Sequence, residues 1–157
     1  MERKNPREGF SKFRRKIFWD RLDVLYFGGY ALWNYLTLAF LLLNPGFVVN
    51  EIESWDEDGE RWRRLHVIFP ANVPPHCTEQ IFYFNYRGFI VRHDYTAEVF
   101  GQWARAAHYS REHKDFNGFV IPTRRRVFPK RCSGHPLRLV TLVSIRINDV
   151  KIVMSGT

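Results

Sequence analysis

Cysteine is scarce in this chain, which has only Cys77 and Cys132 among its 157 residues. Two cysteines are too few for a disulfide framework, and they lack the CxxC spacing of a zinc ligand pair. We therefore expect free thiols, with a single bridge possible only in an oxidising compartment. The sequence predicts no metal site and no cofactor.

Recognisable catalytic motifs are also missing. There is no GxSxG, no P-loop, no GxGxxG and no pair of histidines at i and i+4 beside a glutamate. The weak catalytic candidates are His93, Asp94 and His108, with Tyr83 or Tyr95 as partners of Asp94 or His108. His93 and Asp94 are neighbours in a predicted strand, so their side chains are expected on opposite faces. An enzyme with a His/Asp acid-base pair in a sheet cavity is kept as an alternative hypothesis.

The formal net charge of +8 raises the question of nucleic-acid binding. The basic residues gather in the N-terminal segment and at Arg124 to Arg126, and an acidic run from Glu51 to Glu60 separates these two groups. This distribution favours a solvated basic surface, and no nucleic-acid partner is expected. The first fifteen residues are polar and basic, without a cleavage site after a short apolar core, so we expect a cytoplasmic protein.

Formal charge is absent from one long stretch, Val24 to Asn50. Either it is the buried spine of a β-sheet, or it is a membrane span at about residues 24–49, which would place the protein in a membrane. Gly28-Gly29 would weaken a helix by about 1 kcal/mol per residue relative to alanine. Asn34 lowers the hydrophobicity, and Asn44-Pro45-Gly46 ends the element as a turn. We predict the buried sheet spine and keep the single-pass membrane protein as an alternative.

The rest of the chain has the pattern of antiparallel strands joined by turns. Hairpin turns are predicted at Asp58-Gly59, Arg87-Gly88 and Asn117-Gly118. The segment Trp103 to His113 fits a strand or a helix. Two further expectations concern faces: Phe89, Val91, His93 and Tyr95 should share one face, and Leu139, Thr141, Val143, Ile145 and Ile147 should share one face of a final strand spanning Leu137 to Val153.

This pattern predicts a mainly β protein, with a single antiparallel curved sheet or half-barrel and a short helical or irregular N-terminal arm. Residues 1–20 would form the basic arm and residues 21–157 a single β domain. The aromatic share of 17% suits a sheet with large inward-facing side chains.

Several phrases of the sequence carry a resemblance: WDRLDVLYFGGYALWNYLT, GERWRRLHVIFP, EQIFYFNYRGFIVRHDY and GFVIPTRRRV. With these phrases the chain resembles a family of uncharacterised bacterial proteins, and its architecture is loosely similar to the curved sheets of the lipoprotein carrier class. The resemblance implies a sheet that contacts a hydrophobic ligand or lipid, and it implies that this chain corresponds to the C-terminal portion of the fold. It transfers no catalytic residues.

The function predicted from these observations is non-catalytic binding of a hydrophobic small molecule or lipid on the concave face of the sheet. The candidate lining residues are Trp33, Phe40, Phe82, Phe84 and Tyr95. The sequence is also compatible with two further contacts. The basic arm could contact a membrane surface, and an open sheet edge could pair with a second copy of the chain.

Overall fold

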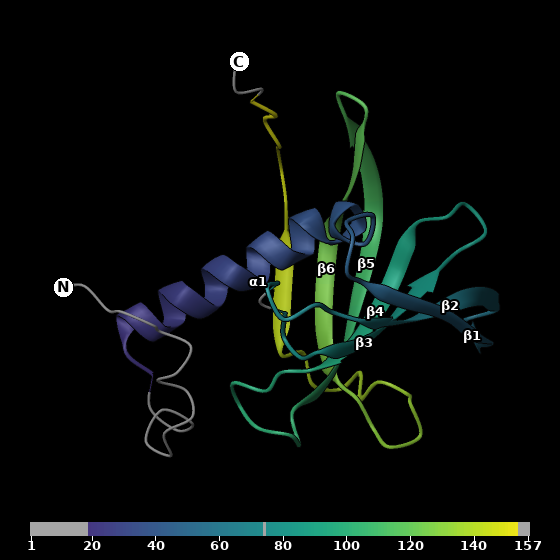
Figure 1. Ribbon diagram of the computed structural model, residues 1–157, viewed down its shortest axis with the longest axis horizontal. Helices are drawn as coiled ribbons and strands as arrows, with labels where there is room; N and C mark the ends of the chain where they lie inside the picture. The colour runs from purple at the N-terminus through teal and green to yellow at the C-terminus, as the bar shows by residue number, and fades with distance from the viewer. Residues whose placement is uncertain (1–18, 74, 154–157) are drawn as a thin grey trace.

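The computed structural model describes residues 19–73 and 75–153, which form one helix followed by a meander of strands (Figure 1). The elements are α1 (Arg21–Leu41), β1 (Val48–Glu57), β2 (Glu60–Ile68), β3 (Glu79–Phe84), β4 (Ile90–Thr96), β5 (Arg105–Phe116), β6 (Phe119–Pro129) and β7 (Val143–Arg146).

All seven strands belong to one antiparallel sheet whose spatial order is the sequence order, β1 to β7. The sheet does not close, so β1 and β7 are its two edges, and α1 lies against one face (Figure 1). The predicted fold class, a mainly β protein with a single open antiparallel sheet, is confirmed. The basic arm predicted at residues 1–20 falls almost entirely outside the described residues.

The uncharged stretch contains a helix, so the prediction of a sheet spine there is wrong. Ala31, Tyr35 and Leu38 are buried at the four- and three-residue spacing of one helix face. Burying a side chain as large as Tyr35 or Leu38 stabilises by about 1.5–3 kcal/mol, which offsets the cost of the two glycines. In the part of the chain that the structure describes, no helix is long and apolar enough to cross a membrane.

The helix begins with a capping box. The Asp20 carboxylate accepts hydrogen bonds from the backbone N–H groups of Leu22 and Asp23, both at 2.9 Å, and the Asp23 carboxylate accepts one from the N–H of Asp20 at 3.2 Å. We expect Asp20→Ala to lower the free energy of unfolding by about 1 kcal/mol, measured by urea denaturation. Asp20→Ser, which keeps an accepting oxygen, should recover most of it, and equal losses in both variants would contradict this role.

The predicted hairpin turns are all present. Asp58-Gly59 and Asn117-Gly118 both have positive φ at both positions (+53° and +79°, +54° and +87°), as a two-residue type I′ turn requires. Gly88 has φ of +78° in the turn between β3 and β4. The ambiguous segment after Trp103 is part of β5, so a strand is formed there.

Two predictions about faces fail for local reasons. Tyr83 pairs with Arg92 but Phe84 pairs with Ile90, so Val91 is an extra bulge residue and turns to the face opposite His93. The final strand is much shorter than Leu137 to Val153: its ladder with β6 covers Val143–Arg146, with one backbone hydrogen bond beyond each end, from Leu142 and from Ile147. The segment before β7 instead forms a loop over the sheet face opposite α1, and Leu139 is 93% exposed.

Candidate functional site

A row of buried aromatic and imidazole side chains lies beneath α1. Phe82, His93 and His108 are cross-strand neighbours on β3, β4 and β5. Phe82 stacks on His93 with ring centroids 5.4 Å apart, and His93 lies 4.6 Å from His108. From α1, Tyr35 meets His108 edge-on at 4.2 Å, and its hydroxyl lies 3.0 Å from the Tyr95 hydroxyl. The helix and sheet are therefore joined by a polar aromatic layer.

Burial disfavours the protonated form of the histidines in this layer. Burial lowers the pKa of His93 and of His108 well below the ordinary value, and the nearby imidazoles and the Arg125 guanidinium act in the same direction. Within the described residues, Nδ1 of His93 and both ring nitrogens of His108 have no hydrogen-bond partner. Buried polar atoms are nearly always paired, so these nitrogens leave hydrogen-bonding capacity unused.

Beside this layer, between α1 and the sheet, lies a pocket of about 220 Å³. Its walls are mainly apolar and include Leu36, Leu38 and Phe40 of α1 and Phe84, Ile90 and Ile121 of the sheet. Its polar lining includes His93, Ser110 and Arg125. The site is thus an apolar pocket with a few polar groups, the usual composition of a small-molecule site.

Arg125 reaches this pocket because β6 places it opposite Ser110 of β5. Its Nη1 donates to Ser110 Oγ at 3.1 Å, and its Nη2 donates to the Tyr35 carbonyl of α1. Burial lowers the pKa of Arg125 to about 10, against a smaller opposing effect of Tyr35. The run Arg124 to Arg126 is therefore not one solvated basic surface, since its central residue is buried while Arg126 is exposed.

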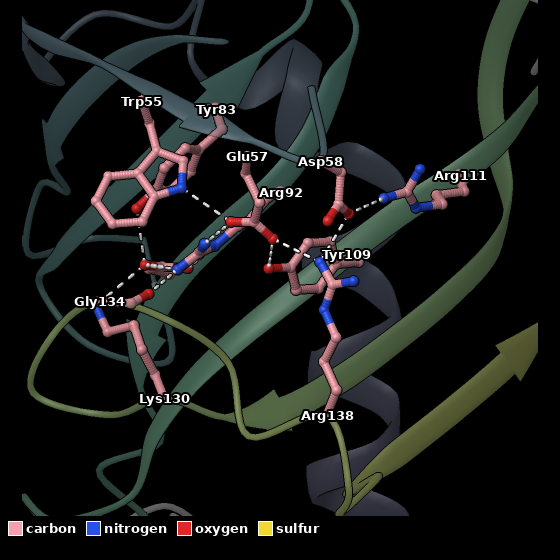
Figure 2. Close-up of polar contacts among 11 residues, drawn as sticks. Trp55, Glu57, Asp58, Tyr83, Arg92, Tyr109, Arg111, Lys130, Gly134 and Arg138 are labelled. Carbon is pink, nitrogen blue, oxygen red and sulfur yellow. Dashed lines mark hydrogen bonds and ion pairs between the residues drawn. The ribbon is translucent and has the colours of Figure 1, made fainter. Parts of the chain in front are cut away.

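The opposite face of the sheet carries a buried ion-pair network centred on Arg92 (Figure 2). Arg92 Nη1 lies 2.6 Å from a Glu57 oxygen, and its Nε and Nη2 donate to the two oxygens of Asp94 at 2.7 and 2.8 Å. Tyr83 donates to Asp94 at 2.9 Å, and Lys130 lies 3.1 Å from the same carboxylate. Both acidic side chains are thus fully engaged.

The loop before β7 closes over this network. Arg92 donates to the Gly134 carbonyl, and Arg138 donates to Glu57 at 2.8 Å and to Asp58 at 2.7 Å (Figure 2). Tyr109 also donates to Glu57. Burial alone would raise the pKa of Glu57, but these hydrogen bonds, one from Trp55 and the Arg92 charge together hold it below its ordinary value. The network fastens the loop to the sheet.

Next to the network is a second, more polar pocket of about 440 Å³. Four arginines line it, Arg111, Arg124, Arg126 and Arg138, together with Tyr109, Phe128 and Thr141. Three of these arginines have acidic partners: Arg124 pairs with Glu112 at 2.9 Å, and Arg111 and Arg138 both pair with Asp58, at 3.4 and 2.7 Å. The lining of this pocket is therefore basic.

The weak catalytic candidates are divided between the two faces. His93 and His108 lie together beneath α1, whereas Asp94 lies in the Arg92 network and contacts Tyr83. His93 and Asp94 therefore point to opposite faces, as the strand pattern predicted. In the described ranges, no group of three or more His, Cys, Asp or Glu side chains is placed to hold a metal ion. Cys77 is buried, Cys132 is exposed, and both are free thiols.

The five lining candidates occupy three environments. Phe40 and Phe84 line the pocket beneath α1, Phe82 and Tyr95 are buried in the core, and Trp33 is 42% exposed on α1. Sequence reasoning missed Tyr35, Ser110 and Arg125. For Arg125 a signal existed: it alternates with Ile121, Thr123 and Val127 along β6, and all four are buried.

Comparisons with known proteins give a structural likeness but no match to a family model or a curated sequence. Among solved structures the chain is similar to a LolA superfamily protein from Nitrosomonas europaea, with 13% sequence identity and a TM-score of 0.43. The alignment covers 58% of this chain and 40% of that chain, so this chain spans less than half the length of that protein.

Proposed function

We propose that the protein binds a hydrophobic small molecule or the hydrocarbon chain of a lipid in the pocket between α1 and the sheet. The observation that carries this proposal is the pocket itself, whose apolar walls come from two packed elements and which includes a few polar groups. Displacing water from such walls favours binding by about 25 cal/mol for each Å² of apolar surface covered. No reaction is required of the site.

The size of the pocket supports a slender ligand. Pockets for drug-sized molecules measure roughly 300–1,000 Å³, and this one measures about 220 Å³. One hydrocarbon chain suits it better than a molecule with several. The exposed apolar side chains of Leu36 and Phe40 on α1 would cover whatever part of the chain extends from the mouth.

The open sheet supports a further contact, self-association. The edge strand β1 has half-exposed Val48 and Val49, and along its outer side no strand of the described residues pairs with its backbone groups. Such an edge can pair with another strand. The membrane contact expected of the basic arm concerns residues outside those that the structure describes.

The ligand proposal is tested with a neutral apolar dye, N-phenyl-1-naphthylamine, whose fluorescence rises on leaving water. We expect the purified protein to bind it at micromolar concentration, and Leu36→Gln to weaken binding about tenfold. The reason is that an amide on the pocket wall replaces apolar contact and must be desolvated when the ligand covers it, at a cost of about 1–3 kcal/mol.

The matched control is Leu32→Gln, one helical turn earlier on α1. Leu32 is 43% exposed and Leu36 is 38% exposed, but only Leu36 lines the pocket. Leu32→Gln should bind the dye as the wild type does. An absence of dye binding by the wild-type protein, or equal weakening in both variants, would refute the proposal.

A further inference from the structure

Among the described residues, two arginines of the sheet are buried, and their surroundings differ. Arg92 has no exposed surface and is paired with two carboxylates, Glu57 and Asp94. Arg125 is 4% exposed, yet none of the ion pairs among residues 19–73 and 75–153 includes it. A buried cation without a counter-ion is unfavourable, so its burial calls for an anion that the described residues do not supply.

The polar contacts of Arg125 are with neutral groups, and polar atoms around it are left unpaired. Ser110 Oγ and the Tyr35 carbonyl accept from its two terminal nitrogens, while its Nε has no partner within the described part of the chain. His93, on β4 and separated from β6 by β5, has an Nδ1 that is also unpaired within the described residues. Arg125, Ser110 and His93 all line the apolar pocket beneath α1. The unpaired polar atoms and the unpaired charge therefore belong to the same pocket.

We infer that the ligand of this pocket is an amphiphile with an anionic head, a carboxylate, held by Arg125 while its hydrocarbon chain lies along the apolar walls. The inference rests on the proposed function and adds the chemical class of the head group. A guanidinium presents parallel N–H donors that match the two oxygens of a carboxylate. Ser110 is placed to donate its hydroxyl proton to the same head group.

The size of the pocket favours a carboxylate over a phosphodiester head. At about 220 Å³ it has little room for a glycerophosphate beside a hydrocarbon chain. A carboxylate adds only two oxygens to the end of the chain, and it can approach a guanidinium edge-on. A lysophospholipid is thus the alternative ligand. The experiment distinguishes it from a carboxylate by comparing the concentrations at which the two displace the dye.

The test compares ligands that differ only in the head. Dodecanoate, dodecanol and dodecyl lysophosphatidylcholine compete with the neutral dye for the full-length wild-type protein. We expect dodecanoate to displace the dye at concentrations about 10- to 100-fold lower than dodecanol, as charge-assisted hydrogen bonds predict. In Arg125→Met the ratio of the two should fall toward one, and in Arg125→Lys it should lie between.

The control is Arg126→Met, the same change at the next residue, which is exposed and lines the other pocket. It should keep the wild-type preference for dodecanoate. If Arg125→Met does not fold, Arg125→Lys and Ser110→Ala carry the test, and both should reduce the preference. Equal displacement by dodecanoate and dodecanol in the wild type, or strongest displacement by the lysophospholipid, would overturn the carboxylate while leaving the apolar pocket in place. No dye binding at all would overturn the pocket as well.

Discussion

Replacing Arg92 with methionine is expected to lower the free energy of unfolding by about 3–5 kcal/mol. The variant leaves the buried carboxylates of Glu57 and Asp94 facing each other without the cation between them. Arg138 still contacts Glu57 and Lys130 still contacts Asp94, but both of these cations are partly exposed. Urea denaturation followed by tryptophan fluorescence measures the loss.

The control is Arg63→Met, because Arg63 also makes two hydrogen bonds to one carboxylate, that of Glu51, at 2.8 and 2.9 Å. That pair lies on the surface, where solvent screens it, so its loss should have little effect on stability. A triple variant that also neutralises both acids, Arg92→Met with Glu57→Gln and Asp94→Asn, should be less destabilised than Arg92→Met alone. If Arg92→Met and Arg63→Met lowered the free energy of unfolding by similar amounts, burial would not explain how the network stabilises the protein.

Acidification from pH 7 to pH 5 is expected to destabilise the protein steeply because of His93 and His108. Burial lowers the pKa of both below the ordinary value of 6.5. Below pH 6.5 the unfolded chain therefore binds protons that the folded chain does not, and stability falls as the pH falls. Each histidine contributes up to about 1.4 kcal/mol per pH unit in that window.

The slope of unfolding free energy against pH, from urea denaturation at several pH values, measures this effect. His108→Phe removes one of the two groups and should reduce the slope by up to half, whatever it does to stability at pH 7. The half-buried His113, whose pKa burial also lowers, contributes in the same direction in wild type and variant alike. The lowered pKa of Glu57 acts mainly below pH 4.5 and stays largely outside this range. An unchanged slope in His108→Phe would contradict the prediction.

Much of the sheet was predictable because its signals are local. The Asp58-Gly59 and Asn117-Gly118 turns require positive φ at both residues, and few dipeptides other than these adopt it readily. Strand alternation then fixed which residues share a face, including the separation of His93 from Asp94. Where one extra residue enters, as at Val91 in β4, the alternation shifts and the sequence gives no local sign of it.

The uncharged stretch shows the limit of local signals. Gly28-Gly29 and the aromatic residues favoured a strand, yet α1 forms because its buried side chains find partners on the sheet: Leu38 beside Val67 and Phe82, and Tyr35 beside His108. A preference of about 1 kcal/mol per glycine is outweighed once a whole helix face is buried. The helix and the strands that it contacts are far apart in the sequence, so no short segment contains the residues of both.

The sequence by itself determined the antiparallel β class, the order of the hairpins and the lack of charge from Val24 to Asn50. Only the tertiary structure decided that this stretch is a helix, that it covers a pocket, and that the arginines of one run point to different faces. The physical reason is the separation along the chain of the residues that interact. Turns and alternation depend on neighbouring residues, whereas the burial of Arg125 beneath Tyr35 depends on two segments ninety positions apart in the chain.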